Sequence, residues 1–346
     1  ARQKVSALTA PSNVVIVGAS DKPGSWSARV WRNLHRYGFT RPIYLINPRR
    51  SEIWDQVCHP NFAALPAPPD HLVILAPATQ VAGALRTGAA AGARSATIFS
   101  SGFGEGYGAT GTLLGKELTD AIRDTGLSVS GPNCMGNICA RSNFVTLVED
   151  RELNLGGGPV ALVGQSGGVM VFLNQALEER GLSTNYLITS GNEIGLCISD
   201  YIAFLACEPD LKVIIVYIEA LKGADDFRQA CLAARSAGKS IIAIKLGQSD
   251  AGRSAALAHT GSLAGSMESF DALCADIGVI RAHTLDEAVE LAELLTHTNP
   301  PAGLRLAALT LSGAYRGLLL DAAERHGLTF PNLAPETKVR IDGALG

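Results

Sequence analysis

Short, unbroken apolar runs separated by helical patterns constrain the fold of this chain more than any other feature. Five such runs occur in the first 148 residues: "NVVIVGAS", "PIYLINP", "HLVILAPA", "SATIFSSGF" and "LSVSGPN". Continuous apolar strands between helices predict a parallel sheet covered on both faces. Because crossovers between parallel strands are right-handed, the pattern predicts a Rossmann-like α/β domain over residues 1–148.

A second series of the same kind follows a polar, Gly-rich linker, "EDRELNLGGGP". Its strands are "VALVGQSGG", "NYLITSGN", "VIIVYIEAL" and "SIIAIKLG", and it predicts a second doubly wound parallel-sheet domain over residues 158–298. After "TNPPAG", residues 303–346 read as the start of a third α/β unit. Two strand–helix units cannot bury both faces of a sheet, so we expect the native chain to continue past Gly346. Docking of these units on the second domain is the alternative.

Charge and hydropathy exclude several classes of protein. The formal net charge of -3 predicts no general attraction to nucleic acid or to an anionic membrane. No window approaches the roughly 20 unbroken apolar residues of a membrane span, and the first residues lack the apolar core of a signal peptide. The cysteines, odd in number, form no CxxC pair. They predict reduced, mostly buried thiols in a cytoplasmic protein, without a metal site.

The turn "VGASDKPGS" after the first strand is a candidate anion site. It offers Gly18, Ser20 and Ser25 at the start of a helix, where backbone N–H groups hold phosphate. Its spacing is not GxGxxG, and an ordinary strand–helix turn is the alternative. The second strand ends in "INPRR", so Asn47 and Arg49 stand where an acidic residue would bind the ribose of NAD. A basic end suits a phosphorylated ribose better than a free diol.

Two further glycine turns follow strands of the second domain. They are "VGQSGG", with Ser166, Gly167 and Gly168, and "TSGNEIG", with Gly191 and Asn192. Both stand at the carboxyl ends of parallel strands, where two helix dipoles could point at one phosphate. Either turn could equally be structural.

The order of these motifs resembles one family. "VIVGAS", "INPRRSEI", "SSGFGE", "GPNCMG", "VGQSGG", "SGNEIG", "VYIEAL" and "AHTGSLAG" are similar to the CoA-binding and ligase domains of NDP-forming acyl-CoA synthetases, relatives of the succinyl-CoA synthetase α subunit. The resemblance covers about residues 10–345. It implies a flavodoxin-like fold for the second domain. It also implies the interconversion of acid, CoA and nucleoside triphosphate with acyl-CoA, nucleoside diphosphate and phosphate, through an acyl-phosphate and a phosphohistidine.

The resemblance also implies roles for residues of this chain. His259 in "AHTG" matches the phosphohistidine, and Glu219 in "YIEAL" matches the glutamate that orients it. The turns at Ser166–Gly168 and Gly191–Asn192 match the helix N-termini that bind the phosphate. The residues on the CoA-binding side are Gly18, Ser20, Ser25, Asn47, Arg49, Pro77, Ser100, Gly102, Pro132 and Asn133.

Histidine suits the role of phosphoryl carrier, because one nitrogen of a neutral imidazole attacks the acyl-phosphate while a carboxylate holds the proton on the other nitrogen. The chain departs from the family at Ala258, where Ser is frequent, and at Arg49, where Lys is common. The remaining histidines are expected to be solvated at element edges or in a loop: His35, His59, His71, His283, His297 and His326.

The expected substrates are CoA and a small carboxylic acid that the sequence does not identify. ATP or GTP, with Mg2+, would bind an ATP-grasp domain or β subunit, in cis or in trans, and an oligomer is expected. Two other classes remain open from sequence: a catalytically silent CoA-sensing module and a NAD-binding oxidoreductase domain. His259 together with Glu219 argues against the sensing module.

Overall fold

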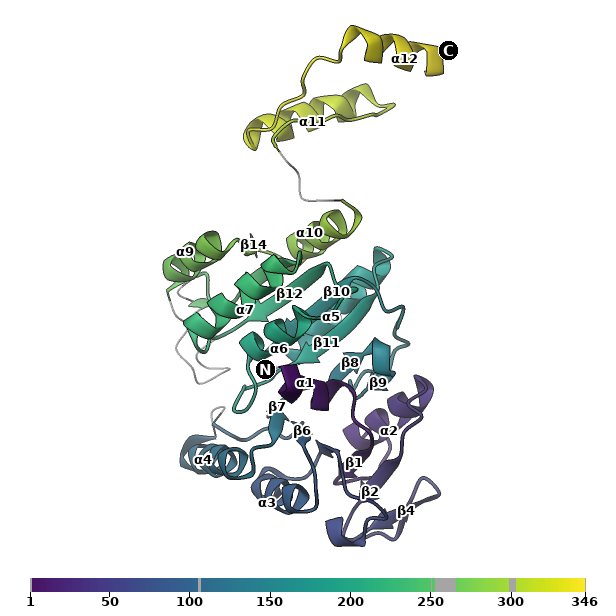
Figure 1. Cartoon of the computed structure of the whole chain (residues 1–346), viewed down its shortest axis with the longest axis vertical. Helices are drawn as coiled ribbons and strands as arrows, with labels where there is room; N and C mark the ends of the chain where they lie inside the picture. The colour runs from purple at the N-terminus through teal and green to yellow at the C-terminus, as the bar shows by residue number, and fades with distance from the viewer. Residues whose placement is uncertain (1, 105–106, 250, 253–265, 299–302, 346) are drawn as a thin grey trace. The chain divides into compact units, whose positions relative to one another are not determined.

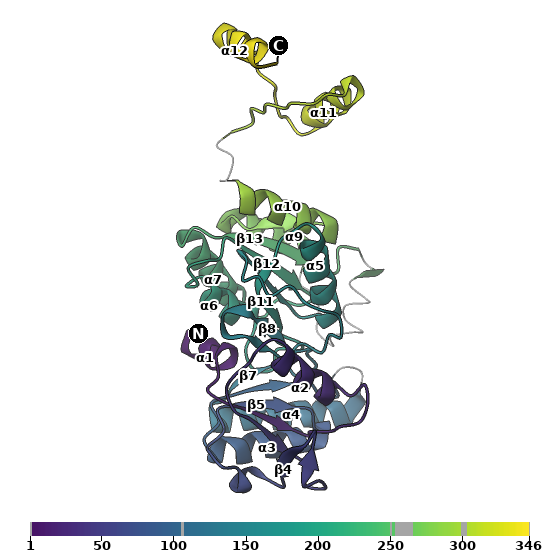
Figure 2. The ribbon, with the colours of Figure 1, turned by 90° about the vertical axis from the view of Figure 1, so that its right-hand side faces the viewer.

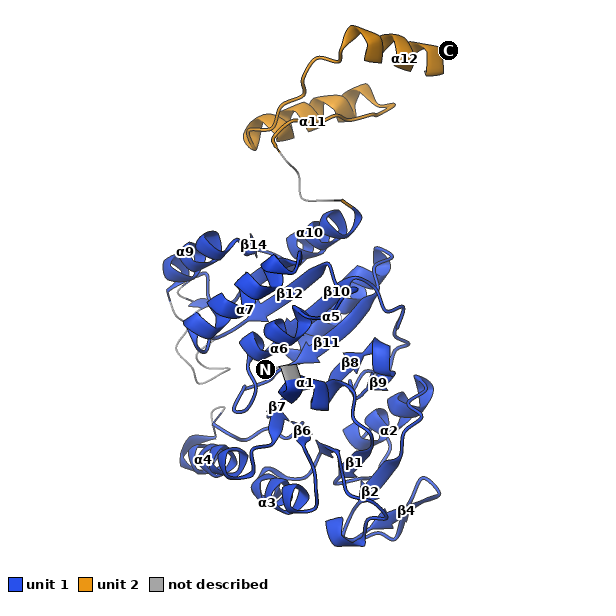
Figure 3. Cartoon of the chain, viewed as in Figure 1, with its two compact units in different colours: residues 1–297 blue, residues 298–346 orange. Residues whose placement is uncertain are grey.

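The computed structural model describes residues 2–104, 107–249, 251–252, 266–298 and 303–345. The chain divides into unit 1, residues 1–297, and unit 2, residues 298–346 (Figure 3). The candidate site residues on the described part of the chain all belong to unit 1, which contains two seven-stranded sheets.

The first sheet has the strand order β3-β4-β2-β1-β5-β6-β7, and only its β3–β4 pair is antiparallel. Its strands are β1 (Val14–Val17), β2 (Ile43–Ile46), β3 (Glu52–Ile53), β4 (Gln56–His59), β5 (His71–Ile74), β6 (Ser95–Ile98) and β7 (Ser128–Ser130). The helices of this part are α1 (Arg2–Thr9), α2 (Trp26–Arg36), α3 (Ala78–Ala90) and α4 (Gly108–Thr125), with a 3-10 turn at Phe62–Ala64. Within the described ranges, no helix combines the length and apolar content that a membrane crossing needs.

Strand β1 shows why its sequence is continuously apolar. Val14 and Ile16 point into the core shared with α1 and α2, and Val15 and Val17 point into the core under α3 and α4. All four side chains are buried, because helices cover both faces of the sheet (Figure 1).

The second sheet has the order β14-β13-β12-β10-β11-β8-β9 and is parallel except where β8 joins β11 and β9. Its strands are β8 (Asn137–Cys139), β9 (Phe144–Val145), β10 (Val160–Gly164), β11 (Thr184–Thr189), β12 (Val213–Ile218), β13 (Ser240–Lys245) and β14 (Ile280–Ala282). The helices are α5 (Gly167–Glu179), α6 (Ile198–Leu205), α7 (Ala224–Ser236), α9 (Met267–Ile277) and α10 (Leu285–His297), with a 3-10 turn at Ala140–Ser142. Helices α5 and α10 cover one face, and α6, α7 and α9 cover the other (Figure 2).

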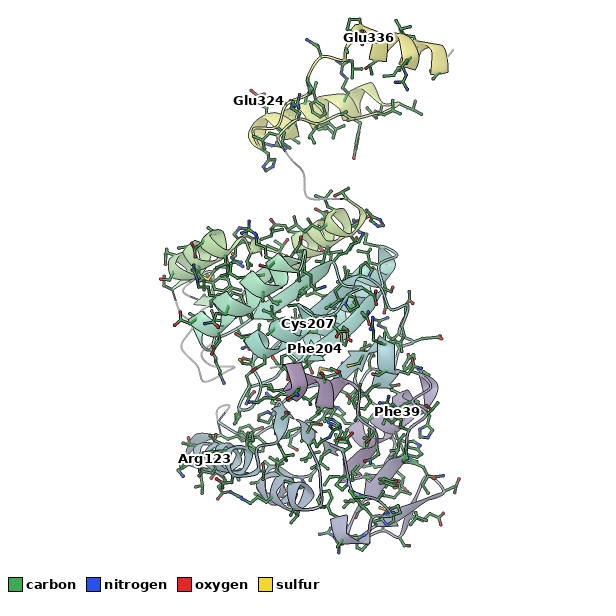
Figure 4. The ribbon with its side chains drawn as sticks, in the orientation of Figure 1. Phe39, Arg123, Phe204, Cys207, Glu324 and Glu336 are labelled. Carbon is green, nitrogen blue, oxygen red and sulfur yellow. The ribbon has the colours of Figure 1, made fainter. Side chains whose placement is uncertain are left out.

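One hydrophobic core joins the two sheets of unit 1. Phe39, after α2, and Phe204, in α6, both belong to it and are labelled in Figure 4. Helix α1 contacts β6 and β7 of the first sheet and α6 of the second part. The doubly wound α/β architecture predicted from the sequence is confirmed for both sheets.

Several features differ from the sequence prediction. Strands β8 and β9 (residues 137–145) extend the second sheet, although the prediction counts residues up to 148 with the first domain. The antiparallel β3–β4 pair and helix α1 were not predicted. His71, expected to be solvated, is fully buried: its Nδ1 lies 2.8 Å from Ser95 Oγ and its Nε2 lies 3.1 Å from Thr97 Oγ1. Burial lowers the pKa of His71 to about 3, so the ring is neutral.

Unit 2 contains α11 (Gly313–Arg325), α12 (Pro335–Leu345) and a parallel β-bridge between Arg305 and Thr329. The run "LRLAALTLSG", predicted as a strand, has only this bridge in the structure. Within this unit, apolar side chains such as Leu309 and Leu311 are largely exposed.

Candidate active site

Two cavities that contain predicted site residues lie at the carboxyl ends of the strands, one on each sheet. In the first sheet the strand order reverses between β1 and β5, and in the second it reverses between β10 and β12. Ligands of doubly wound sheets bind at such switch points. The loops after these strands line the two cavities of unit 1 described below.

The cavity on the second sheet is called the turn cavity here. It has a volume of about 230 Å³. Its lining residues are Trp26, Asn133, Met135, Gln165, Ser166, Gly167, Gly191, Asn192, Glu219, Ala220 and Lys222. The structure therefore brings Glu219 together with residues of both glycine turns.

The first glycine turn opens helix α5. Ser166 is its N-cap, with Oγ accepting a hydrogen bond from the Val169 N–H at 3.4 Å. A Cβ on Gly167 would lie 2.4 Å from Met135 Cγ, whereas a Cβ on Gly168 would meet nothing within 4 Å. The helix N-terminus and its first glycine face the cavity, so they offer unpaired N–H groups and a positive dipole end to an anion. Gly168 is the one predicted phosphate residue of this turn that does not line the cavity.

The second glycine turn is built differently from the expectation. Helix α6 begins at Ile198, after a capping box formed by Cys197 and Asp200, so Gly191–Asn192 is not a helix N-terminus. The turn instead packs on the first domain: the Asn192 N–H donates to the Pro132 carbonyl at 3.0 Å. The residues between the turn and α6 follow no helical pattern, so the sequence contained a usable signal against a helix N-terminus at this turn.

Gln165 ties the first turn to the loop that carries Glu219. Its Oε1 accepts the backbone N–H groups of Glu219 at 2.6 Å and Ala220 at 2.9 Å. Its Nε2 donates to the Ala220 carbonyl at 2.7 Å. Glu219 itself is only 4% exposed, and these hydrogen bonds fix the backbone that carries its side chain at the cavity.

Glu193 and Lys222 are charged neighbours of this arrangement. Glu193 is buried, and its Oε1 accepts from Ser190 Oγ at 2.7 Å and from the Ile198 N–H at 3.1 Å. Burial raises the pKa of Glu193 to about 7, against hydrogen bonds from Ser190 and Gln165. Lys222 Nζ donates to the carbonyls of Asn192 at 2.7 Å and Glu193 at 3.0 Å, which places a cation on the wall of the cavity.

Glu193→Gln is expected to change how stability depends on pH. The folded protein binds a proton at Glu193 more tightly than the unfolded chain, whose pKa is near 4.5. The wild type therefore loses stability as the pH rises from about 4.5 through 7. The variant lacks this pH-dependent loss. Its free energy of unfolding should therefore rise by up to roughly 3 kcal/mol relative to that of the wild type between pH 5 and pH 8. Urea unfolding at the two pH values measures it.

Exposed Glu52→Gln is the control and should leave the pH dependence unchanged. Parallel pH profiles for wild type and Glu193→Gln would show that Glu193 does not titrate in this range.

The cavity on the first sheet has a volume of about 470 Å³ and is lined by Gly18, Asn47, Arg49 and Pro77, among others. Asn47 is fixed there, since its Nδ2 donates to the Ala19 carbonyl at 2.9 Å and its Oδ1 accepts the Arg49 N–H at 2.9 Å. Arg50 pairs with Asp21 outside the cavity. In the described part of the chain the Arg49 guanidinium makes no ion pair, so it is available to a phosphate.

Of the other predicted CoA residues, Asn133 lines the turn cavity. The remaining five line neither of these two cavities: Ser20, Ser25, Ser100, Gly102 and Pro132. Ser25 caps α2, and its Oγ donates to the Ser20 carbonyl at 3.2 Å. Ser100 forms a hydrogen bond to one lining residue of each cavity. Its Oγ donates to the Ala76 carbonyl, and its carbonyl accepts the Asn133 N–H at 3.0 Å. Ala76 lines the first-sheet cavity and Asn133 lines the turn cavity.

Gly102 and Pro132 have backbone roles in the structure. Gly102 has a positive φ of 103°, and the Pro132 carbonyl supports the second glycine turn.

The proposed carrier, His259, lies outside the described residues. Within the described ranges, no group of three or more His, Cys, Asp or Glu side chains is arranged to hold a metal ion.

Sequence reasoning did not identify several residues of the turn cavity. They are Trp26, Met135, Gln165, Ala220 and Lys222. Gln165 stands inside the motif "VGQSGG", so its place in a strand–helix turn was a usable signal. Met135 likewise stands inside the motif "GPNCMG", whereas Trp26 carried no such signal, because it comes from the first domain and lies outside the quoted motifs.

Two family models match the chain. Residues 12–140 match a model described as a CoA binding domain, and residues 157–295 match a succinyl-CoA ligase like flavodoxin domain. A trans-feruloyl-CoA synthase from an unknown prokaryotic organism is 33% identical over 96% of the chain, and the chain spans 47% of that protein. The α subunit of acetate–CoA ligase (ADP-forming) I of Pyrococcus furiosus is 31% identical over 97% of the chain, which spans 72% of it.

A solved structure shows the same architecture. The dinucleotide-forming acetyl-coenzyme A synthetase 1 of Ca. Korarchaeum cryptofilum, in complex with phosphate and ADP, matches with a TM-score of 0.88 at 29% identity, over 97% of this chain and 71% of that one. The fold and the cavities define a CoA-binding Rossmann-like domain joined to a succinyl-CoA ligase-like flavodoxin domain. The chain belongs to the family of NDP-forming acyl-CoA synthetases, and it corresponds to the part represented by the α subunits of ADP-forming acetate–CoA ligases.

Proposed function

We propose that this chain is the CoA-binding and phosphoryl-carrying part of an acyl-CoA synthetase that forms acyl-CoA, nucleoside diphosphate and phosphate. The observation that carries the proposal is the turn cavity, where a helix N-terminus, a second glycine turn and the buried carboxylate of Glu219 meet at a switch point. This arrangement suits an anion that must be bound and then passed to an imidazole.

The residues of the turn cavity have separate tasks in this proposal. Backbone N–H groups at Ser166 and Gly167 and at Gly191 neutralise the phosphate without a mobile side chain. Lys222 adds positive charge on the same wall. His259 takes the phosphoryl group on one ring nitrogen, and Glu219 holds the proton on the other nitrogen.

CoA would occupy the first-sheet cavity and reach the turn cavity past Ser100. Arg49 would bind a phosphate of the adenine-nucleotide end, and Asn47 would shape the cavity floor. The thiol would then arrive beside the phosphate that leaves the acyl group.

The remaining parts of the reaction are proposed to lie outside this chain. ATP or GTP with Mg2+ would bind an ATP-grasp domain, in cis or as a β subunit, in an oligomeric, cytoplasmic enzyme. The acid is a carboxylic acid: the printed names of the relatives include ligases of acetate and 4-hydroxybutyrate and a trans-feruloyl-CoA synthase.

Calorimetric titration of the chain with CoA and with NAD tests the proposal. CoA is expected to bind at least tenfold more tightly than NAD. Arg49→Ala should weaken CoA binding by about tenfold, the value of one charge-assisted hydrogen bond. Arg123→Ala, on the exposed surface of α4 (Figure 4), should leave it unchanged. Tighter binding of NAD than of CoA would contradict the proposal.

A further inference from the structure

Trp26 has an unusual position for a large aromatic residue. It is the first residue of α2 in the CoA-binding domain, yet its side chain lines the turn cavity of the second sheet. The side chain is 40% exposed. A tryptophan that keeps this much surface on a cavity wall leaves apolar area for a ligand to cover.

The indole of Trp26 packs against a buried aromatic ring. Its ring centroid lies 6.2 Å from that of Phe99, at an interplanar angle of 73°, and Phe99 is buried. The backbone at Trp26 is fixed as well, because Ser25 caps the helix by accepting the Ala28 N–H at 3.2 Å. The indole is therefore a preorganised wall, whose ordering costs little on binding.

The rest of the cavity divides into a polar part and an apolar part. The polar part is formed by the two glycine turns, Glu219 and Lys222. The apolar part is formed by Trp26, Met135 and Ala220. Met135 is packed against Gly167, so its thioether lies directly beside the proposed phosphate position.

The proposed chemistry specifies which group must lie on the apolar part. The acyl-phosphate reacts with the CoA thiol: the acyl carbon–sulfur bond forms, the carbon–oxygen bond to phosphate breaks, and the thiol proton leaves with the phosphate. The acyl group thus lies between the phosphate and CoA. Trp26 stands in this place, one residue after Ser25 on the CoA side and on the wall of the phosphate cavity.

We propose that the indole of Trp26 binds the organic part of the acid, and that the acid has a planar, aromatic or unsaturated side chain rather than the two carbons of acetate. This inference rests on the proposed function and extends it to the substrate class. A flat apolar wall binds a planar group more tightly, because the two stack and bury apolar area, whereas an acetyl group covers little of the wall.

Calorimetry with CoA, acetyl-CoA and cinnamoyl-CoA tests the inference on this chain. Cinnamoyl-CoA is expected to bind at least tenfold more tightly than CoA, and acetyl-CoA within about threefold of CoA. Trp26→Ala should abolish the tenfold gain without changing the affinity for CoA, and Trp26→Phe should keep part of it. Phe172→Ala, which removes a 67% exposed aromatic residue of α5 outside the cavity, should change nothing.

The outcomes separate the two proposals. Equal affinities of the wild type for acetyl-CoA and cinnamoyl-CoA would overturn the assignment of Trp26 to the acyl group. A loss of CoA affinity in Trp26→Ala as large as the loss of cinnamoyl-CoA affinity would overturn it too. Neither outcome contradicts the proposed function, because the wild type still binds CoA. Absence of CoA binding to the wild type would overturn the proposed function, and this inference with it.

Discussion

The complete enzyme carrying His259→Asn is expected to form acyl-CoA at least about a thousandfold more slowly than wild type. Asparagine keeps a polar side chain of similar reach, but its amide nitrogen does not accept a phosphoryl group. Without the carrier, phosphate cannot travel between the turn cavity and the nucleotide. Nucleotide-dependent formation of acyl-CoA, followed with the acid in excess, measures the effect.

A partial reaction serves as the control for His259→Asn. Conversion of acyl-CoA and phosphate to acyl-phosphate and CoA requires the turn cavity but no carrier. The variant should therefore retain it at close to the wild-type rate, which would show that the fold and the CoA site are intact. Wild-type synthesis of acyl-CoA by the variant would remove His259 from the mechanism.

Gly191→Ala is expected to destabilise the protein by about 3 kcal/mol or more. Gly191 has a φ of 59°, a left-handed conformation that L side chains rarely adopt. Its Cβ would lie 2.1 Å from the Pro132 carbonyl oxygen and 2.8 Å from that of Asn133. Both are backbone atoms, so no side-chain rotation relieves the overlap. The turn must separate from the first domain, and the cavity loses one wall.

Gly168→Ala is the matched stability control for Gly191→Ala. A Cβ there meets nothing within 4 Å, and the residue lies inside α5, where alanine is favoured over glycine. Its free energy of unfolding should stay equal to that of wild type or rise slightly. Equal stability of the two variants in urea unfolding would show that the Gly191 turn can move away from Pro132 freely.

Much of the fold follows from local patterns in the sequence. Strands such as β10 and β12 are buried on both faces, so their apolar runs are unbroken, and glycine turns follow them. Strands β8 and β9 are short and antiparallel, and they are paired through β11. Their assignment to the second sheet depends on long-range pairing that no local period encodes.

The candidate site also has residues that the sequence predicts and residues that it does not. Ser166, Gly167 and Glu219 belong to motifs, and the sequence predicts that they act together. Trp26 reaches the cavity only because the two sheets pack on one core, and Glu193 has its raised pKa only because it is buried. Such properties arise from tertiary packing, which a reading of neighbouring residues does not contain.

The phosphoryl-carrier role of His259 is tested most directly by locating the phosphate on the protein. The complete enzyme is incubated with ATP labelled at the γ-phosphate and digested with trypsin, and the label is mapped. An acid-labile, base-stable label is expected on the fragment Ser254–Arg281, in which His259 is the sole histidine, and no label is expected in His259→Asn. Label on another fragment, or equal labelling of His259→Asn, would contradict this role.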